Sequence, residues 1–141
     1  MAKFHQGFYE PKHPEKYVGN RKPRYRSGWE LTFMRMCDNH PNILSWASEP
    51  VKIPYRNPFN GDYTHYVPDF MMMYVTKSGK KIVELVEIKP KSQTIIEKAK
   101  NPHDKARVVV NRAKWKAAAE WTKRKGMRFR VLNEDSIYAI K

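Results

Sequence analysis

Residues 67–91 read VPDFMMMYVTKSGKKIVELVEIKPK, and this stretch decides the fold of the chain. Two mainly apolar runs, residues 69–75 and 81–89, flank the polar tetrapeptide Lys77-Ser78-Gly79-Lys80. A short polar segment with a glycine between two runs of strand-forming residues is typical of a β-hairpin. The sequence therefore predicts two antiparallel strands joined by a tight turn.

Alternation of side chains along the second strand brings charged groups together. Successive residues of a strand point to opposite faces, so Glu87 and Lys89 share one face while Ile88 lies on the other. With the turn centred in the middle of the polar tetrapeptide, Asp69 falls opposite Ile88, within one position. We therefore expect Asp69, Glu87 and Lys89 to meet at the open end of the hairpin.

These three side chains suit the hydrolysis of a phosphodiester bond. Two converging carboxylates can bind a hard divalent cation such as Mg²⁺, which takes few carboxylate ligands and keeps water and phosphate oxygens in its shell. The ammonium of Lys89 can orient the attacking water or offset developing negative charge. Glu-Ile-Lys alone is common in edge strands, where its charges only face solvent. The combination on one hairpin favours a nuclease site.

The net charge of the chain indicates a polyanionic partner. The 141 residues include 28 Lys and Arg against 14 Asp and Glu, which gives a formal net charge of +14, and the isoelectric point is about 9.9. Such a surplus favours DNA or RNA, with charge for solubility alone as the alternative. No run approaches the roughly 18 apolar residues of a membrane span, so we expect no membrane partner. The first residues hold no apolar signal core, so we do not expect export.

Other classes of site lack their motifs. Cys37 is the single cysteine, so no internal disulfide is expected, which fits a reducing cytosol. The five histidines are scattered without the spacing of zinc ligands. Neither of the glycine-rich motifs that bind ATP or dinucleotides is present.

The length allows one domain with one core. We expect residues 1–24 to form a basic, proline-containing arm and residues 25–141 to form a single domain that carries the nuclease motifs. The aromatic residues of the arm can pin it to the domain or to a partner, and the sequence leaves both open; they are Phe4, Phe8, Tyr9 and Tyr17.

Local signals predict the remaining elements. Ser27 and Glu30 have the spacing of a capping box, which predicts a helix from Ser27 that ends before Pro41. Short extended runs at residues 43–48, 51–55 and 63–66 predict a meandering sheet. Residues 92–108 are expected to form a loop with at most a helical turn. A second helix is predicted at 111–125, closed by Gly126, and a strand at 128–132.

Three helical residues carry open interpretations. Glu30 completes the capping box, and the same carboxylate can also serve the active site. Lys114 leans toward the packed side of the second helix, where it either extends past Trp115 to solvent or reaches the active site. Asn111 falls on the packed side of the same helix, and the alternative is that it is the N-cap of that helix. The opposite face offers phosphate contacts through Arg112, Lys116 and Lys123.

With these motifs in view, the chain resembles the PD-(D/E)XK nucleases. It is most similar to their TnsA-like branch and to the head-completion nucleases of large contractile-tailed phages. The resemblance runs from about Tyr25 to Asp135. The shared motifs are Tyr25-Arg26-Ser27-x-Trp29-Glu30, Ser48-Glu49, Ile53-Pro54-Tyr55, Val67-Pro68-Asp69-Phe70, Val86-Glu87-Ile88-Lys89-Pro90-Lys91, Val110-Asn111-x-x-Lys114-Trp115 and Phe129-Arg130-x-Leu132-x-Glu134-Asp135.

The resemblance implies an α/β fold of the restriction-endonuclease-like type, with a mixed central sheet flanked by helices. It implies that Asp69 and Glu87 are metal ligands for Mg²⁺ or Mn²⁺. It also implies that Lys89 is the catalytic lysine, with Glu30 as an auxiliary acid and Lys114 as a further active-site residue. We expect DNA contacts from Lys91 and from the outer face of the second helix, Arg112, Lys116 and Lys123.

The function expected on this basis is metal-dependent endonuclease action on DNA, largely independent of sequence. The similarity to head-completion nucleases implies processing of packaged DNA in filled heads before tails join, with head or neck proteins as partners. The protein would then act in the cytoplasm of an infected bacterium and in the virion. The alternatives are a non-catalytic basic connector that binds DNA and head proteins, a transposon-end endonuclease and a junction-resolving endonuclease.

Overall fold

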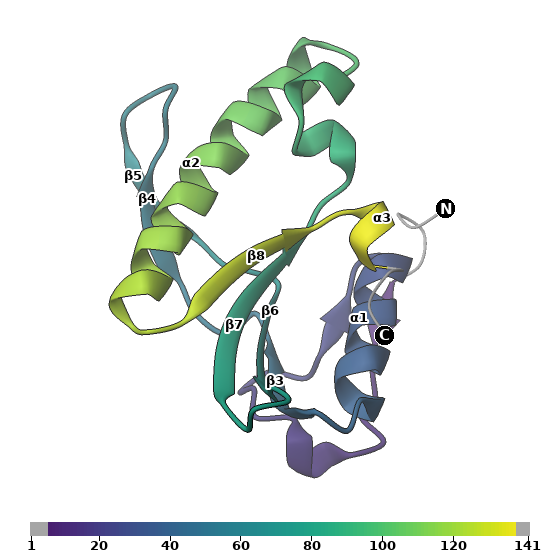
Figure 1. The fold of residues 1–141 in the computed structure, drawn as a ribbon. Coiled ribbons are helices and arrows are strands. Elements are labelled where there is room, and N and C mark those ends of the chain that lie inside the picture. Colours follow the sequence, from purple (N-terminus) through teal and green to yellow (C-terminus); the bar gives the residue numbers. More distant parts are fainter. Residues whose placement is uncertain (1–5, 138–141) are drawn as a thin grey trace.

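A four-stranded mixed sheet lies at the centre of the computed structural model, which describes residues 6–137. Its order is β3 (Ile43–Ser48), β6 (Phe70–Val75), β7 (Lys81–Ile88) and β8 (Arg128–Leu132). The first three strands are antiparallel, and β8 runs parallel to β7. Helices α1 (Gly28–Asn39) and α2 (Pro102–Arg124) lie on opposite sides of this sheet (Figure 1). The predicted α/β fold with a mixed sheet is confirmed.

The β6–β7 hairpin forms where the sequence predicts it. The Gly79 N–H donates to the carbonyl of Thr76 (2.9 Å), and Gly79 has φ +85°, a conformation that glycine adopts without strain. The strands pair Phe70 with Val86, so their register places Asp69 opposite Glu87. The predicted partner was Ile88 within one position, and the difference of one residue follows from a turn centred on Ser78.

Strand β7 is buried on both faces, as a central strand between two helices must be. Val86 and Ile88 join the core that α1 covers, together with Trp46, which is fully buried. Leu85 joins a second core, which includes Ala118 of α2. The predicted alternation along this strand is therefore confirmed.

Helix α1 has the predicted start. The hydroxyl of Ser27 accepts a hydrogen bond from the Glu30 N–H (3.1 Å), as an N-cap does. Phe33, which is fully buried, stacks on Phe70 of the sheet with ring centroids 4.8 Å apart. The helix ends before Pro41, as expected.

Helix α2 begins nine residues earlier than predicted, at Pro102 rather than Asn111. Proline is well tolerated in the first turn of a helix, where its missing N–H would have no partner, and Asn101 caps the helix by accepting from the Asp104 N–H (2.8 Å). The expected loop at 92–108 is therefore wrong beyond residue 101. Asn111 is not an N-cap: it is buried in mid-helix and donates to the carbonyl of Gln93 (3.1 Å).

The predicted meander of strands is also wrong. Strands β4 (Ile53–Arg56) and β5 (Tyr63–Tyr66) pair only with each other, and β3 pairs with β6 instead. After β3 the backbone of Glu49 turns through a left-handed conformation (φ 49°), and Pro50 follows it, so the chain leaves the sheet. The β4–β5 hairpin packs on α2 through the second core.

The segment before residue 25 lies against the domain. It forms β1 (Gly7–Phe8), a 3-10 turn at Pro14–Lys16 and β2 (Arg24–Tyr25). Its aromatic rings contact the core. Tyr9 and Tyr17 lie 6.1 and 4.7 Å from the Trp46 ring, between centroids, and the Val18 N–H donates to the Trp46 carbonyl (2.9 Å). These two tyrosines therefore contact the domain, whereas Phe8 is 60% exposed. Phe4 lies outside the described residues, and the division at residue 24 stays a prediction.

Asp38, at the end of α1, anchors this segment. Its buried carboxylate accepts hydrogen bonds from the Tyr9 hydroxyl and from the N–H groups of Lys12 (2.7 Å) and His13 (3.0 Å). Burial alone would raise the pKa of Asp38, but these three donors favour the charged form and hold the pKa below its usual value.

No helix within residues 6–137 is long and apolar enough to cross a membrane.

We predict that Asp38→Asn lowers the free energy of unfolding at pH 7 by roughly 1.5–3 kcal/mol, the usual contribution of hydrogen bonds to a charged group. An acid with a lowered folded-state pKa stabilises the fold above its unfolded pKa of about 3.9 and loses that contribution as pH falls through the folded value. The difference between the two proteins should therefore shrink at acid pH. Urea unfolding from pH 7 to pH 3 measures it, and a difference independent of pH would contradict the role of the charge.

Candidate active site

Asp69 and Glu87 lie together at the open end of the β6–β7 hairpin. The Asp69 N–H donates to Glu87 Oε1 (3.1 Å), and the Ile88 N–H donates to Asp69 Oδ2 (2.8 Å). The Glu87 side chain is only 5% exposed, while Asp69 is partly buried. Each acid is thus held by the backbone of the other strand, which fixes the separation of the two carboxyl groups.

Glu49, to which sequence reasoning assigned no role, supports Asp69 from the neighbouring strand. Its N–H donates to the Asp69 carbonyl (2.8 Å), and its carboxylate pairs with Arg26 and with Arg21 (3.5 Å to Nη1). A left-handed backbone at a residue other than glycine is uncommon and costs energy. The signal in the sequence was the Ser48-Glu49 pair, which does not reveal a left-handed turn.

Lys89 lies beside the two acids, as predicted. Its Nζ is 3.8 Å from Glu87 Oε2, and its side chain is 32% exposed. The Lys89 N–H donates to the carbonyl of Leu132 (2.9 Å), which extends the parallel pairing with β8. The backbone of Lys89 is therefore held by β8, and its ammonium group is accessible to solvent.

The electrostatics of the acid pair favour a cation. Burial and the charge of Glu87 raise the pKa of Asp69 well above its usual value, although the Ile88 N–H and Lys89 oppose this. Burial also raises the pKa of Glu87, against the opposing effects of the Lys89 charge, of the Tyr66 hydroxyl nearby and of the hydrogen bond from Asp69. Two carboxyl groups in this position are stabilised by a positive charge between them.

The donors at this site fit a hard divalent cation. Residues 6–137 contain no group of three or more His, Cys, Asp or Glu side chains placed to hold a metal ion. Mg²⁺ is commonly held by one or two carboxylates, with water and substrate phosphate completing its shell. Asp69 and Glu87 supply such a pair, whereas a structural zinc ion requires four protein ligands.

Glu30 supports the start of α1, and its role at the active site stays a prediction. Its carboxylate accepts from the Arg26 N–H (3.3 Å) and the Ser27 hydroxyl (3.4 Å), so it stabilises the start of α1. Burial and the nearby charge of Asp69 raise the pKa of Glu30 to about 7. The structure therefore brings this acid into the electrostatic field of the site.

Lys114 also reaches the site. Its Nζ lies 5.8 Å from the ring centroids of both Tyr55 and Tyr66, within the range of cation–π contacts. Burial and the charge of Lys89 lower the pKa of Lys114, against the opposing effect of Glu87 and Asp69. Lys114 therefore lies over two tyrosine rings within the electrostatic influence of Lys89 and the acids, and its role at the active site stays a prediction.

Tyr66 is a second residue that sequence reasoning missed. Burial and the charges of Glu87 and Asp69 raise the pKa of its hydroxyl, so the group stays protonated beside the acids. The buried Tyr66 Oη and Trp115 Nε1 make no hydrogen bond of good geometry within the described residues. A tyrosine in a strand next to an aromatic helix residue reads as core, so no signal in the sequence distinguished it.

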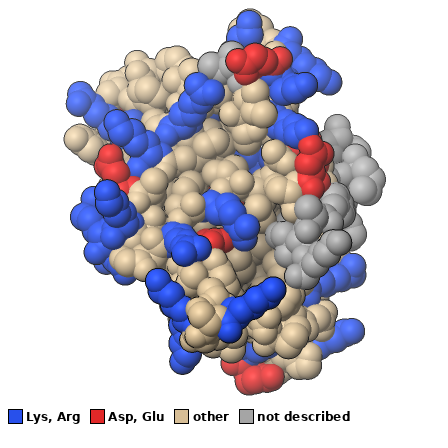
Figure 2. Space-filling model, viewed as in Figure 1, with Lys and Arg blue, Asp and Glu red and all other residues tan. Residues whose placement is uncertain are grey.

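The structure does not bring the predicted DNA contacts of α2 to the acids. Arg112, Lys116 and Lys123 are exposed on the side of the helix away from its buried residues. In the view of Figure 2, Lys and Arg side chains are spread over the surface and acidic ones appear as isolated spots. The basic surface is therefore wider than the predicted residues alone.

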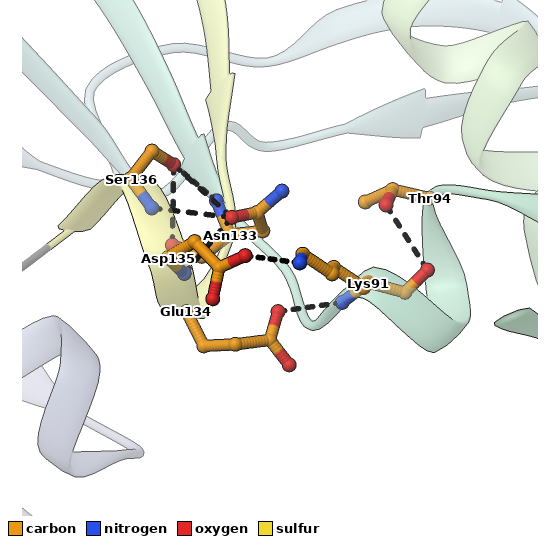
Figure 3. A network of polar contacts seen from close by, with 6 residues as sticks. All are labelled: Lys91, Thr94, Asn133, Glu134, Asp135 and Ser136. Atoms are coloured by element: carbon orange, nitrogen blue, oxygen red, sulfur yellow. Dashed lines mark hydrogen bonds and ion pairs between the residues drawn. The ribbon is translucent and has the colours of Figure 1, made fainter.

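Lys91 is tied to the C-terminal part of the domain (Figure 3). Its ammonium pairs with Asp135, and its N–H donates to Glu134 Oε1 (2.8 Å). Its carbonyl accepts from the Thr94 hydroxyl (3.1 Å). These contacts hold the chain that follows β7, so Lys91 has a structural role whether or not it also contacts DNA.

Comparison with known proteins places this site in a family context. Residues 40–134 match the family described as TnsA-like endonuclease N terminal. The head completion nuclease of Enterobacteria phage T4 is 33% identical over 147 residues, an alignment that covers 96% of this chain and 95% of that protein. The family match includes Asp69, Glu87, Lys89 and Lys114, whereas Glu30 precedes it.

We predict that Asp69→Asn raises the melting temperature of the metal-free protein. The asparagine can still accept from the Ile88 N–H and can donate to Glu87, while the repulsion between the partly buried Asp69 and the buried Glu87 disappears. A gain of about 1 kcal/mol corresponds to roughly 3 °C for a domain of this size. Thermal unfolding in a chelator measures it. Asp62→Asn, at an exposed turn, controls for the change in net charge, and a lower melting temperature for Asp69→Asn than for this control would contradict the repulsion.

Proposed function

The chain belongs to the TnsA-like endonucleases, and we propose that it hydrolyses DNA phosphodiester bonds at Asp69, Glu87 and Lys89 with a bound divalent metal ion. Membership of this family makes it an endonuclease and therefore a hydrolase. The observation that carries the proposal is the pair of converging acids, with Glu87 3.8 Å from the ammonium of Lys89.

Asp69 and Glu87 would hold Mg²⁺ or Mn²⁺ at the end of the hairpin. When bound, such an ion supplies Lewis acidity to the phosphoryl group and favours the deprotonation of water. The hydrogen bonds between the two strands keep both acids in place before substrate arrives. Preorganised groups of this kind avoid reorganisation during the reaction.

Lys89 and Lys114 would act on the substrate. The partly exposed Lys89 ammonium can orient the attacking water or offset charge on the phosphate. Lys114, lying over two tyrosine rings, adds a second positive charge on the side of α2. Glu30, with a pKa of about 7, is a candidate auxiliary acid that can exchange a proton near neutral pH.

We propose a role in phage head completion. The T4 relative is named a head completion nuclease, and the two chains align over nearly their whole lengths. By this similarity the protein would process packaged DNA in filled heads, with head or neck proteins as partners, in the infected bacterium or the virion. The presence of Asp69, Glu87 and Lys89 favours catalysis over a purely connecting role.

DNA contacts beyond the acids would come from the basic surface. Arg112, Lys116 and Lys123 offer phosphate contacts along α2, and Lys91 lies close to the active centre in the chain. Phosphate contacts position a nuclease without reading its sequence. We therefore propose binding that is largely independent of sequence.

The central experiment compares Lys89→Ala with Lys81→Ala on linear, circular and branched DNA, with and without Mg²⁺. Lys89→Ala should lower the cleavage rate by on the order of a hundredfold, because it removes one preorganised charge from the reaction centre. Lys81 is exposed at the other end of the same strand, so its loss should leave the rate unchanged. Parent-like cleavage by Lys89→Ala would overturn the assignment of the active centre.

Substitution of a proposed metal ligand should change the dependence of the cleavage rate on Mg²⁺, which substitution of Lys89 should not. Asp69→Ala should weaken the metal site, so its residual activity should rise with the concentration of Mg²⁺, whereas that of Lys89→Ala should not. Cleavage rates across a Mg²⁺ titration distinguish the two. An identical response of both variants would argue against separate roles.

Salt dependence tests the proposed DNA contacts. Replacing Arg112, Lys116 and Lys123 together by Ala should weaken DNA binding and make the slope of log affinity against log salt shallower by about 2 to 3. Fluorescence anisotropy from low to moderate salt measures this slope.

A matched control variant removes three exposed lysines of the β6–β7 turn region, Lys77, Lys80 and Lys81. If its slope changes as much as that of the α2 variant, the contacts are spread over the whole surface and α2 has no special part.

A further inference from the structure

A pocket of about 490 Å³ is lined by Lys89 and Lys114, and the function proposed above uses only these two of its lining residues. Lys89 connects it to the acids through its Nζ, 3.8 Å from Glu87 Oε2, and Gln93 and Asn111 contribute amide groups. Arg107 and His103 line it from the first turns of α2. The pocket therefore combines positive charge with hydrogen-bonding groups beside the proposed reaction centre.

One wall of this pocket is aromatic. Phe59, in the loop of the β4–β5 hairpin, lines the pocket and is nevertheless 64% exposed. Single exposed apolar side chains are common on protein surfaces, so what distinguishes Phe59 is its place in the same pocket as Lys89, Lys114 and Arg107. Sequence reasoning gave Phe59 no role, because it lies in a polar turn far from the active-site motifs.

The loop holds Phe59 in place. The Phe59 N–H donates to Asn57 Oδ1 (2.9 Å), and the Asn57 N–H donates to the Asp62 carbonyl (2.9 Å). Arg56 Nε donates to the Gly61 carbonyl (2.9 Å). The ring is therefore presented by an ordered turn, so little conformational entropy would be lost when it binds a ligand.

An aromatic ring next to positive charges matches the two parts of a nucleotide. A base can stack on the ring while phosphates contact Lys89, Lys114 or Arg107, as in proteins that bind single strands. Bases inside an intact duplex already stack on each other, so only an unpaired base can use the Phe59 ring. An acidic segment of a protein would satisfy the cations but has no need of an exposed ring face.

We propose that Phe59 stacks on an unpaired base next to the scissile phosphate. The substrate class would then be DNA with single-stranded character at the cut site, such as an overhang, a flap or a frayed end. This inference rests on the proposed nuclease function, because the active centre defines which phosphate is cut.

The test measures stacking without cleavage. DNA with 2-aminopurine in a single-stranded overhang is bound in a chelator, and its fluorescence is compared with that of the same probe in a blunt duplex. Wild-type protein should quench the overhang probe. Phe59→Ala should lose this quenching and bind overhang DNA about tenfold more weakly, the low end of the effect of losing one stacked base. Binding of blunt duplex should be unchanged.

Two variants make the result specific. Phe59→Tyr keeps the ring and should retain both quenching and affinity. Phe8→Ala removes another exposed phenylalanine, 60% exposed and not among the residues lining this pocket, and should behave as wild type.

The outcomes separate this inference from the proposed function. If the protein cleaves DNA but Phe59→Ala leaves binding and quenching unchanged, the inference is overturned and the nuclease function stands. An equal loss on overhang and blunt DNA would also overturn it. If quenching depends on Phe59 but no DNA is cleaved with Mg²⁺ or Mn²⁺, the stacking role stands and the proposed catalysis fails.

Discussion

The reciprocal hydrogen bonding between Asp69 and the strand opposite it is the interaction on which the site depends. The Asp69 N–H donates to Glu87, and the Ile88 N–H donates to Asp69. These bonds hold two acids together although burial opposes both charges and the charge of Glu87 opposes that of Asp69. The position of Lys89 follows from the same strand, which continues its pairing with β8. A one-residue slip of this hairpin would turn Asp69 to the face opposite Glu87 and Lys89, which stay together on their own strand.

The surrounding fold supports this pair from several sides. Glu49, which follows β3, contacts Asp69 through its backbone and is held by Arg26. The segment before residue 25 packs on Trp46 of β3. The length of α2 matters too, because its first turns line the pocket and its middle carries Lys114. Residues with strained or unfavourable environments commonly gather where function requires them.

One core mainly stabilises the sheet, and the other also contacts residues of the proposed active site. The core under α1 contains the large side chains Phe33, Trp46 and Phe70 and fixes the sheet. The core under α2 contains Tyr55 and Tyr66, whose rings also lie against Lys114. Substitutions in the second core are therefore expected to affect the site as well as the fold. The β4–β5 hairpin, which lies outside the four-stranded sheet, connects this core to the exposed ring of Phe59.

The sequence by itself determined the central hairpin, the start of α1 and the meeting of Asp69, Glu87 and Lys89, because side-chain alternation, a turn glycine and a capping residue act over a few neighbouring positions. For Glu30 and Lys114 it left two interpretations open. The start of α2 at Pro102 was also encoded locally, by the Asn101 cap and the proline after it, but sequence reasoning missed it. The tertiary structure alone decided the path of β4 and β5 and the roles of Glu49, Tyr66 and Phe59. These features depend on contacts between segments far apart in the chain, which local periodicity does not encode.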